Sequence, residues 1–258
     1  MTEKHQVLRV DSPAEDIRVF TIDRAESRNA INDAVARQLE TALRNFDSDP
    51  TARVGILTGA GSGFCAGLDL KAFLDGELGE TSDGGFAGFA KSPPTKPLIA
   101  AVEGFALAGG FELLLACDLV VASSDARLGL PEVRRGLAAD GGALLRMPRR
   151  IPVNVAMELA LTGAEVSTVR LASLGLINVV TEPGRALTEA ISLATDIASN
   201  SPLGVVASKQ VLRASPAWTD TERWARQAEI VKPIWTSNDA KEGARAFQEK
   251  RPPRFAGN

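Results

Sequence analysis

Two stretches of the chain share a pattern that can stabilise negative charge on a bound molecule. In each, an apolar strand-like run ends in glycines and a helix-like run follows at once; the stretches are Phe64–Lys71 and Gly104–Asp118. Glycine lets the backbone turn sharply and lets a ligand approach closely. Because helix N-termini expose N–H groups with partial positive charge, two such ends facing one point would stabilise an oxyanion. The alternative interpretation is that both are simple strand-to-helix turns.

A carboxylate stands inside the second stretch, where Glu112 is surrounded by phenylalanine and leucines. Burying a carboxylate among apolar side chains costs free energy unless it has a partner or a purpose. Glu112 is therefore a candidate acid or base, and the alternative is a structural carboxylate that accepts hydrogen bonds from backbone N–H groups.

Several other chemistries fit the sequence poorly. The single histidine, His5, lies near the N-terminus, so a Ser-His-Asp or Cys-His arrangement lacks a base. No Cys/His cluster has zinc spacing and no Asp/Glu run has the pattern of a calcium loop, so no metal is expected. Gly104 and Gly109 have P-loop spacing, but Gly110 replaces the required lysine, and Phe64 interrupts the dinucleotide pattern that begins at Gly59. Neither ATP nor NAD is expected.

Composition restricts the partners and the compartment. With 29 basic and 32 acidic side chains the net charge is -3, so nucleic acid finds no general attraction. Cys65 and Cys117 are far apart and flanked by apolar residues, which favours buried, reduced thiols and a cytoplasmic location. The N-terminus has no signal-peptide pattern. The apolar run from Pro97 to Ala122 contains three carboxylates, so we expect core and not membrane.

Hydrophobic periodicity predicts the elements that position these residues. The first half is expected to run β-β-α-β, with strands at Leu8–Val10, Ile17–Ile22 and Val54–Leu57 and a helix at Ala34–Phe46. A further buried strand is expected at Pro97–Val102 and a helix at Val153–Leu161. The Gly-, Ser- and Asp-rich segment Asp75–Pro94 is interpreted as a mobile loop or an irregular helix.

The C-terminal part of the chain is helical and charged. Amphipathic helices are expected at Val205–Leu212, Glu222–Val231 and Asp239–Glu249. We therefore divide the chain into a core at residues 1–198 and a helical C-terminal region at residues 199–258.

Five motifs in order resemble the enoyl-CoA hydratase/isomerase family, also called the crotonase family. The resemblance covers nearly the whole chain and is carried by Ile22–Ile31, Phe64–Lys71, Ala101–Glu112, Leu130–Glu132 and Asn238–Arg251. It implies an α/β fold, a spiral of repeated β-β-α turns, with a C-terminal helical region that builds a homotrimer or a hexamer. It also implies an acyl-CoA thioester substrate. CoA is then part of the substrate, and no separate cofactor is implied.

The resemblance assigns roles to particular residues. The backbone N–H groups of Leu68 and Gly109 would form an oxyanion hole around the thioester oxygen. Glu112 and Glu132 stand where hydratases of the family carry two catalytic glutamates, with Glu112 as the base for water and Glu132 as the proton donor to C2. For Glu132, as for Glu112, a structural carboxylate is the alternative.

CoA binding is implied less specifically. Candidates around the substrate are Arg28, Ala66, Asp69, Leu70, Lys71 and Lys250. Solvated-surface interpretations remain open for the basic ones, and Asp69 fits a helix cap at least as well. Glu103 and Asp118 are interpreted as structural. The arginine cluster at 134, 135, 146, 149 and 150 is interpreted as a solvated face or the neighbourhood of the CoA phosphates.

The chain departs from the family pattern in two places. Glu103 stands where many relatives have asparagine, and Ala138–Gly142 replaces a loop that more often contains Pro-Gly. Asp140 could reshape the water or acyl site, and Ala72–Pro94 is expected to shape the acyl pocket. The leading expectation is reversible hydration of a trans-2-enoyl-CoA, as in fatty-acid β-oxidation. Alternatives are an enoyl-CoA isomerase, a carnitinyl-CoA-type dehydratase and a non-catalytic acyl-CoA binder.

Overall fold

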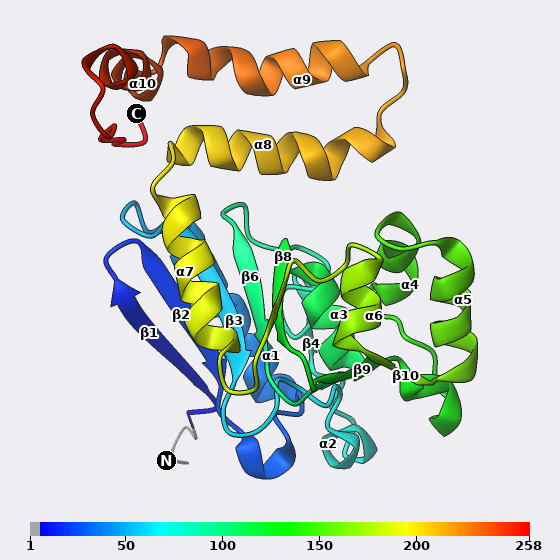
Figure 1. The fold of residues 1–258 in the computed structure, drawn as a ribbon. Helices are drawn as coiled ribbons and strands as arrows, with labels where there is room; N and C mark the ends of the chain where they lie inside the picture. The colour runs from blue at the N-terminus through cyan, green and yellow to red at the C-terminus, as the bar shows by residue number, and fades with distance from the viewer. Residues whose placement is uncertain (1–5) are drawn as a thin grey trace.

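A six-stranded sheet forms the centre of the protein. The computed structural model describes residues 6–258 and is drawn in Figure 1. The strand order is β1-β2-β3-β6-β8-β11, and every neighbouring pair is parallel except β1 and β2. The bounds are Leu8–Ala14, Ile17–Ile22, Val54–Gly59, Leu98–Val102, Leu119–Ser123 and Val179–Thr181.

Helices cover both faces of this sheet. On one face lies α7 (Ala186–Ala198), whose alanines at 186, 190, 194 and 198 pack against the β-branched side chains of the strands. Alanine at every fourth position forms one stripe along a helix, so α7 approaches the sheet closely. On the other face α1 (Asp33–Ser48) and α3 (Gly109–Ala116) belong to the larger apolar core. The carboxylate of Glu103, which follows β6, accepts hydrogen bonds from the N–H groups of Gly184 and Ala186 and so caps α7, as expected of a structural residue.

Smaller elements surround the second face. A three-stranded sheet has the order β10-β9-β7, and a two-stranded sheet joins β4 to β5. The strands are β4 (Glu80–Thr81), β5 (Gly85–Phe86), β7 (Phe105–Leu107), β9 (Arg127–Gly129) and β10 (Glu165–Ser167). The short helices are η1 (Ala25–Ser27), α2 (Leu70–Leu74), η2 (Pro131–Arg135), α4 (Ala143–Arg146), η3 (Met147–Arg149), α5 (Val153–Thr162) and α6 (Thr168–Ser173).

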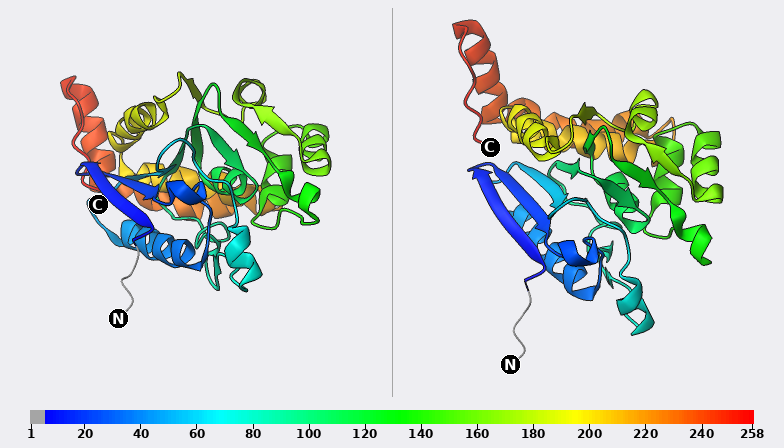
Figure 2. Two further views of the ribbon diagram at one scale, coloured as in Figure 1. Left: turned by 90° about the horizontal axis from the view of Figure 1, so that it is seen from below. Right: turned by 60° about the horizontal axis from the view of Figure 1, so that its bottom comes forward.

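The C-terminal helices extend beyond the sheet. They are α8 (Pro202–Ala214), η4 (Ser215–Ala217), α9 (Arg223–Val231), η5 (Lys232–Thr236) and α10 (Asn238–Glu249). Asp118 anchors α8, because its carboxylate accepts hydrogen bonds from Lys209 Nζ at 2.6 Å and from Arg213 Nε at 3.0 Å. Figures 1 and 2 show α8 and α9 side by side and α10 projecting from the rest of the molecule. Trp224, Trp235 and Phe247 on these helices are largely exposed.

Most of the predicted elements are confirmed with small changes at their ends. The β-β-α-β beginning, the strand before Glu103, the helix after Pro152 and the three C-terminal helices are all present. Segment 75–94 contains no helix; its middle forms the β4–β5 pair, and Ala87, Phe89 and Ala90 are buried. Hydrogen bonds from Thr81 to Glu40 and from Arg44 to Asp83 join this segment to α1. These long-range contacts explain why local composition did not predict its structure.

The cysteine prediction is confirmed, since Cys65 and Cys117 are free and buried, and burial raises the pKa of each thiol to about 12. His5 lies outside the described residues. Within residues 6–258 no helix combines the length and the apolar character needed to cross a membrane.

Candidate active site

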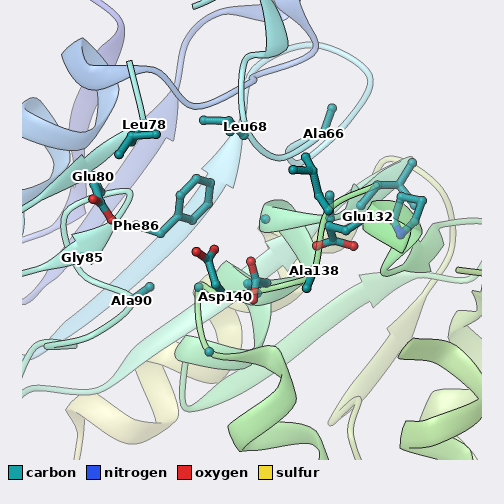
Figure 3. A pocket seen from close by; sticks show the side chains of 18 of the residues that line it. Ala66, Leu68, Leu78, Glu80, Gly85, Phe86, Ala90, Glu132, Ala138 and Asp140 are labelled. Atoms are coloured by element: carbon teal, nitrogen blue, oxygen red, sulfur yellow. The ribbon is translucent and has the colours of Figure 1, made fainter. Parts of the chain in front are cut away.

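A cavity of about 880 Å³ brings the predicted site residues together. Arg28, Ala66, Leu68, Leu70, Gly109, Glu112 and Glu132 all line it. The walls come from segments that are far apart in the sequence: the turns before α2 and α3, the segment containing β4 and β5, helix η2 and the loop that follows η2. Figure 3 shows the carboxylates of Glu132 and Asp140 and the ring of Phe86 around the same space.

The two glycine-containing turns lie side by side. Cys65 forms an isolated parallel bridge with Ala106, and the N–H of Leu107 donates to the carbonyl of Cys65 at 3.0 Å. The backbone of Gly67 lies next to the first residue of α3, so a methyl group on Gly67 would come 2.8 Å from the Gly109 nitrogen. Leu68, the residue after Gly67, and Gly109 therefore lie close together at the wall of the cavity, which agrees with the predicted oxyanion hole.

Backbone strain marks the turn before Gly109. Ala108 has φ 51° and ψ -128°, a conformation that usually requires glycine, and it supplies no side-chain cap to α3. As the first residue of α3, Gly109 has no acceptor for its N–H within the helix. The strained turn thus leaves a polarised N–H group at the cavity.

Glu112 is buried in the first turn of α3, with 4% of its surface exposed. Its Oε1 accepts a hydrogen bond from the N–H of Ala143 at 3.0 Å. Burial raises the pKa of Glu112; the N–H groups of Ala143 and Gly141 oppose this rise, and the charge of Asp140 adds to it. Glu112 is therefore a carboxylate whose ionised form has backbone donors but little water.

Glu132 differs from Glu112 because no other described residue donates a hydrogen bond to its carboxylate. It belongs to η2 and is 9% exposed, and neither of its carboxylate oxygens has a hydrogen-bond partner among the described residues. Burial raises its pKa to about 7; the backbone N–H of Glu132 itself opposes this rise, and the nearby charge of Glu112 adds to it. A buried carboxyl group without partners is costly when ionised, so Glu132 holds its proton close to neutral pH.

The remaining predicted residues divide into two groups. Arg28 lies in the cavity wall, and its guanidinium is 4.5 Å from the centre of the Phe105 ring. Asp69, Lys71 and Lys250 do not line the cavity. Asp69 is the N-cap of α2 and pairs with Arg24 at 2.9 Å, while Lys250 ends α10 in a left-handed conformation. Their predicted contacts with CoA stay predictions.

The arginine cluster does not form the single solvated face that was one interpretation of it. Arg146 donates hydrogen bonds to the carbonyls of Ala90 and Gly141, so it joins the segment containing β4 and β5 to the loop that follows η2. Arg150 donates to the carbonyl of Cys117 at 2.8 Å. Arg135, Arg146 and Arg149 line the cavity, which agrees with the other interpretation, a position near bound phosphate groups.

Three residues that shape the site were not singled out from the sequence. Asn29 is buried and donates to the carbonyls of Ala60 and Gly63, which fixes the glycine-rich turn after β3. Phe86 lies so close to α3 that a methyl group on Gly109 would come 2.5 Å from its ring. A methyl group on Gly141 would come 2.7 Å from Glu112 Oε2. The Gly-Gly pair at 141–142 can be seen in the sequence, but the sequence does not show that Gly141 lies against Glu112, which is 29 residues earlier.

Comparison with known proteins agrees with this geometry. The family model described as enoyl-CoA hydratase/isomerase matches residues 13–258. An enoyl-CoA hydratase of Mycobacterium tuberculosis is 39% identical over 92% of each chain, and a carnitinyl-CoA dehydratase of Proteus mirabilis is 37% identical over 92% of this chain and 93% of its own. The crystal structure of an enoyl-CoA hydratase from Mycobacterium marinum superposes with a TM-score of 0.95 at 53% identity, covering 98% of this chain and 99% of that one.

The chain therefore belongs to the enoyl-CoA hydratase/isomerase family. The predicted crotonase-like α/β fold is confirmed by the structural match. Relatives named enoyl-CoA hydratase are hydro-lyases, and the prediction of an enzyme of this class is confirmed as well. Among residues 6–258, no group of three or more His, Cys, Asp or Glu side chains is arranged to hold a metal ion.

Proposed function

We propose that this protein is an enoyl-CoA hydratase that reversibly adds water to a trans-2-enoyl-CoA. The observation that carries the proposal is the pair of buried glutamates in one cavity, of which Glu112 accepts backbone N–H groups and Glu132 has no partner. Two carboxyl groups in such different surroundings favour one ionised and one protonated member at neutral pH, as hydration requires.

The reaction assigns one proton movement to each glutamate. Ionised Glu112 takes a proton from water as the water oxygen forms a bond to C3 of the enoyl group. The electrons of the C2=C3 bond move toward the thioester, and the resulting enolate oxygen accepts hydrogen bonds from the N–H groups of Leu68 and Gly109. Protonated Glu132 then gives its proton to C2, which completes the 3-hydroxyacyl-CoA. Proton exchange with solvent restores the starting charges of both glutamates.

A crotonyl-CoA assay tests this proposal directly. Loss of the enoyl absorbance on addition of enzyme, with formation of 3-hydroxybutyryl-CoA, is the expected result. Tight binding of crotonyl-CoA without turnover would contradict the proposal and indicate an acyl-CoA binder. If an added 3-enoyl-CoA shifted its double bond while crotonyl-CoA took up no water, the enzyme would be an isomerase.

A specialised dehydratase or an isomerase is the second candidate, and one feature favours it. Asp140 places a further carboxylate in the cavity besides Glu80, Glu112 and Glu132, in the loop where the sequence departs from the family pattern. The similarity to a carnitinyl-CoA dehydratase also supports a specialised dehydratase. An isomerase that uses one carboxylate would behave differently from a hydratase. Substitution of one glutamate would then lower kcat strongly, and substitution of the other would lower it only slightly.

We further propose that residues 199–258 form an assembly module that builds a trimer or a dimer of trimers. Trp224, Trp235 and Phe247 are 74%, 78% and 87% exposed in a single chain, and aromatic side chains are enriched at protein interfaces. Light scattering at micromolar concentration should give the mass of a trimer or a hexamer, and a monomer would contradict the assignment. The buried free thiols of Cys65 and Cys117 suit the reducing cytoplasm, where we place the enzyme.

A further inference from the structure

We infer that Asp140 selects enoyl-CoA substrates whose acyl group carries a hydroxyl group beyond C3. This inference rests on the proposed hydratase function and specifies its substrate class. It concerns the loop at residues 138–142, which lies between η2 and α4 and forms one wall of the cavity.

The position of Asp140 carries the first step. Its side chain lines the same cavity as Glu112 and Glu132, and Figure 3 shows its carboxylate directed toward the ring of Phe86. The charge of Asp140 acts on the pKa of both glutamates, which places it close to the groups that act at C2 and C3. The next residue, Gly141, lies against Glu112, because a methyl group on it would come 2.7 Å from Oε2. We therefore place the atoms of the acyl group beyond C3 next to Asp140.

The surroundings of Asp140 carry the second step. Among residues 6–258, no side chain or backbone group forms a hydrogen bond or an ion pair with its carboxylate, and the residue is exposed to solvent within the cavity. The basic residues that also line the cavity are Arg28, Lys91, Arg135, Arg146 and Arg149. None of them forms an ion pair with Asp140 among residues 6–258, and Arg146 donates to the carbonyls of Ala90 and Gly141. The carboxylate of Asp140 thus relies on water.

A bound acyl group changes this situation. An alkyl chain beside Phe86 removes water from Asp140 and offers no donor in exchange, so the desolvation of the charge opposes binding. A hydroxyl group replaces the lost water with a charge-assisted hydrogen bond. Phe86 packs against the carbon atoms of either chain, so it does not distinguish the two. The preference therefore depends on Asp140.

Two substrates of equal chain length test the inference, namely trans-5-hydroxy-2-pentenoyl-CoA and trans-2-hexenoyl-CoA, which differ by a hydroxyl in place of a methyl group. We expect the wild-type kcat/KM to favour the hydroxylated substrate by about tenfold or more. Asp140→Leu has a similar size and no charge, and it should lower this ratio by about tenfold. Asp140→Asn keeps an acceptor and should give an intermediate ratio. An effect on the glutamates that is common to both substrates cancels in the ratio.

Asp75→Leu is the matched control, because Asp75 is exposed, ends α2 and does not line the cavity. It should leave the ratio unchanged. A wild-type ratio at or below one, or an equal ratio in wild type and Asp140→Leu, would overturn the inference. If neither substrate turned over, the hydratase function would fail, and calorimetric Kd values for 5-hydroxypentanoyl-CoA and hexanoyl-CoA would still decide the role of Asp140. Equal affinities for these two thioesters would refute it.

Discussion

The helices α2 and α3 both begin after glycine-containing turns, but their N-terminal N–H groups are capped differently. At α2, the side chain of Asp69 accepts hydrogen bonds from the N–H groups of Lys71 and Ala72, as helix caps usually do. At α3, no side chain caps the helix, and Ala108 holds a strained conformation instead. The capped terminus satisfies its own donors, whereas the uncapped terminus leaves a donor for a ligand. A missing cap at a buried helix start is therefore the informative feature.

The pKa values of the acidic residues at the two helix starts, Asp69 and Glu112, are shifted in opposite directions. Burial tends to raise the pKa of Asp69, but Arg24 and two backbone N–H groups outweigh it, so the pKa is lowered. For Glu112 the balance is reversed, because burial exceeds the effect of the N–H groups of Ala143 and Gly141. A lowered pKa stabilises the ionised form and with it the fold, whereas a raised pKa makes the carboxylate of Glu112 a stronger base than an exposed glutamate.

The largest expected effect is the loss of kcat when Glu112 or Glu132 is substituted. Glu112→Gln and Glu132→Gln preserve shape and should leave the affinity for CoA thioesters within roughly a few-fold. Each should lower kcat for hydration by at least about a hundredfold, because a positioned acid or base is lost. The double variant should lose far less than the product of the two effects, since both groups act on one transition state.

A nearly wild-type rate in either single variant would contradict the two-glutamate mechanism. Loss of thioester binding together with a lowered melting temperature would instead indicate a structural role for the substituted glutamate.

The second prediction tests the donor that the uncapped helix provides. Gly109→Pro removes the N–H and should lower kcat by about a hundredfold or more. Gly109→Val keeps the N–H but places atoms against Phe86, so it should also lose activity. Leu68→Ala keeps its N–H and should retain substantial turnover. Normal turnover by Gly109→Pro would show that this N–H does not bind the thioester oxygen.

The third prediction concerns the loop that holds Glu112. Gly141→Ala places a methyl group 2.7 Å from Glu112 Oε2, which displaces either the carboxylate or the loop. We expect kcat to fall by about tenfold, since small displacements of a catalytic group are costly. Gly204→Ala in α8 is the control, because its nearest neighbouring atom would be 3.8 Å away. Equal activity of the two variants would mean that Gly141 does not position Glu112.

Local sequence patterns were sufficient for most of the elements, and the candidate site residues came from motifs that resemble a known family. The alternation in Ile17–Ile22 and the helical spacing in Ala34–Phe46 report burial of one face, which is a local property. The helix cap at Asp69 could also be predicted, because Lys71 and Ala72, whose N–H groups donate to Asp69, lie within three positions of it.

Features that depend on distant contacts could not be predicted in this way. Nothing near Ala90 in the sequence indicates that Arg146 binds its carbonyl, and nothing near Glu112 indicates that Gly141 and Ala143 lie beside it. The different environments of Glu112 and Glu132 arise from those contacts, so the division of labour between them required the fold. The roles of these residues in catalysis stay predictions for the experiments above.

The fourth prediction is the pH dependence of hydration. The pKa of Glu132 is raised to about 7, and hydration requires its protonated form. As pH rises above this value the proton is lost, so kcat/KM should fall about tenfold per pH unit, the slope expected for one essential acid. Because the charge of Asp140 raises the pKa of both glutamates, Asp140→Asn should move this fall to lower pH. A flat profile between pH 6 and pH 9 would contradict the role of Glu132.

The smallest expected effect lies at the capped helix and concerns stability. Asp69→Ala removes the cap of α2 and the ion pair with Arg24, and it should cost about 1 kcal/mol of unfolding free energy. For a chain of this size we expect a fall in Tm of roughly 2–4 °C. Asp75→Ala, which removes an exposed carboxylate at the other end of the same helix, should change Tm by less.

The sign of the pH dependence provides an independent check on Asp69. Its pKa is lowered in the folded protein, so its contribution is complete above the unfolded pKa and is lost as pH falls toward the folded value. The Tm difference between wild type and Asp69→Ala should therefore be larger at pH 7 than at pH 3. Because Asp69 acts through the backbone next to Leu68, kcat for crotonyl-CoA should fall less than tenfold, far less than in the glutamate variants. A hundredfold loss of kcat without loss of stability would instead place Asp69 among the groups that contact the substrate, and the contrast between the two helix termini would fail.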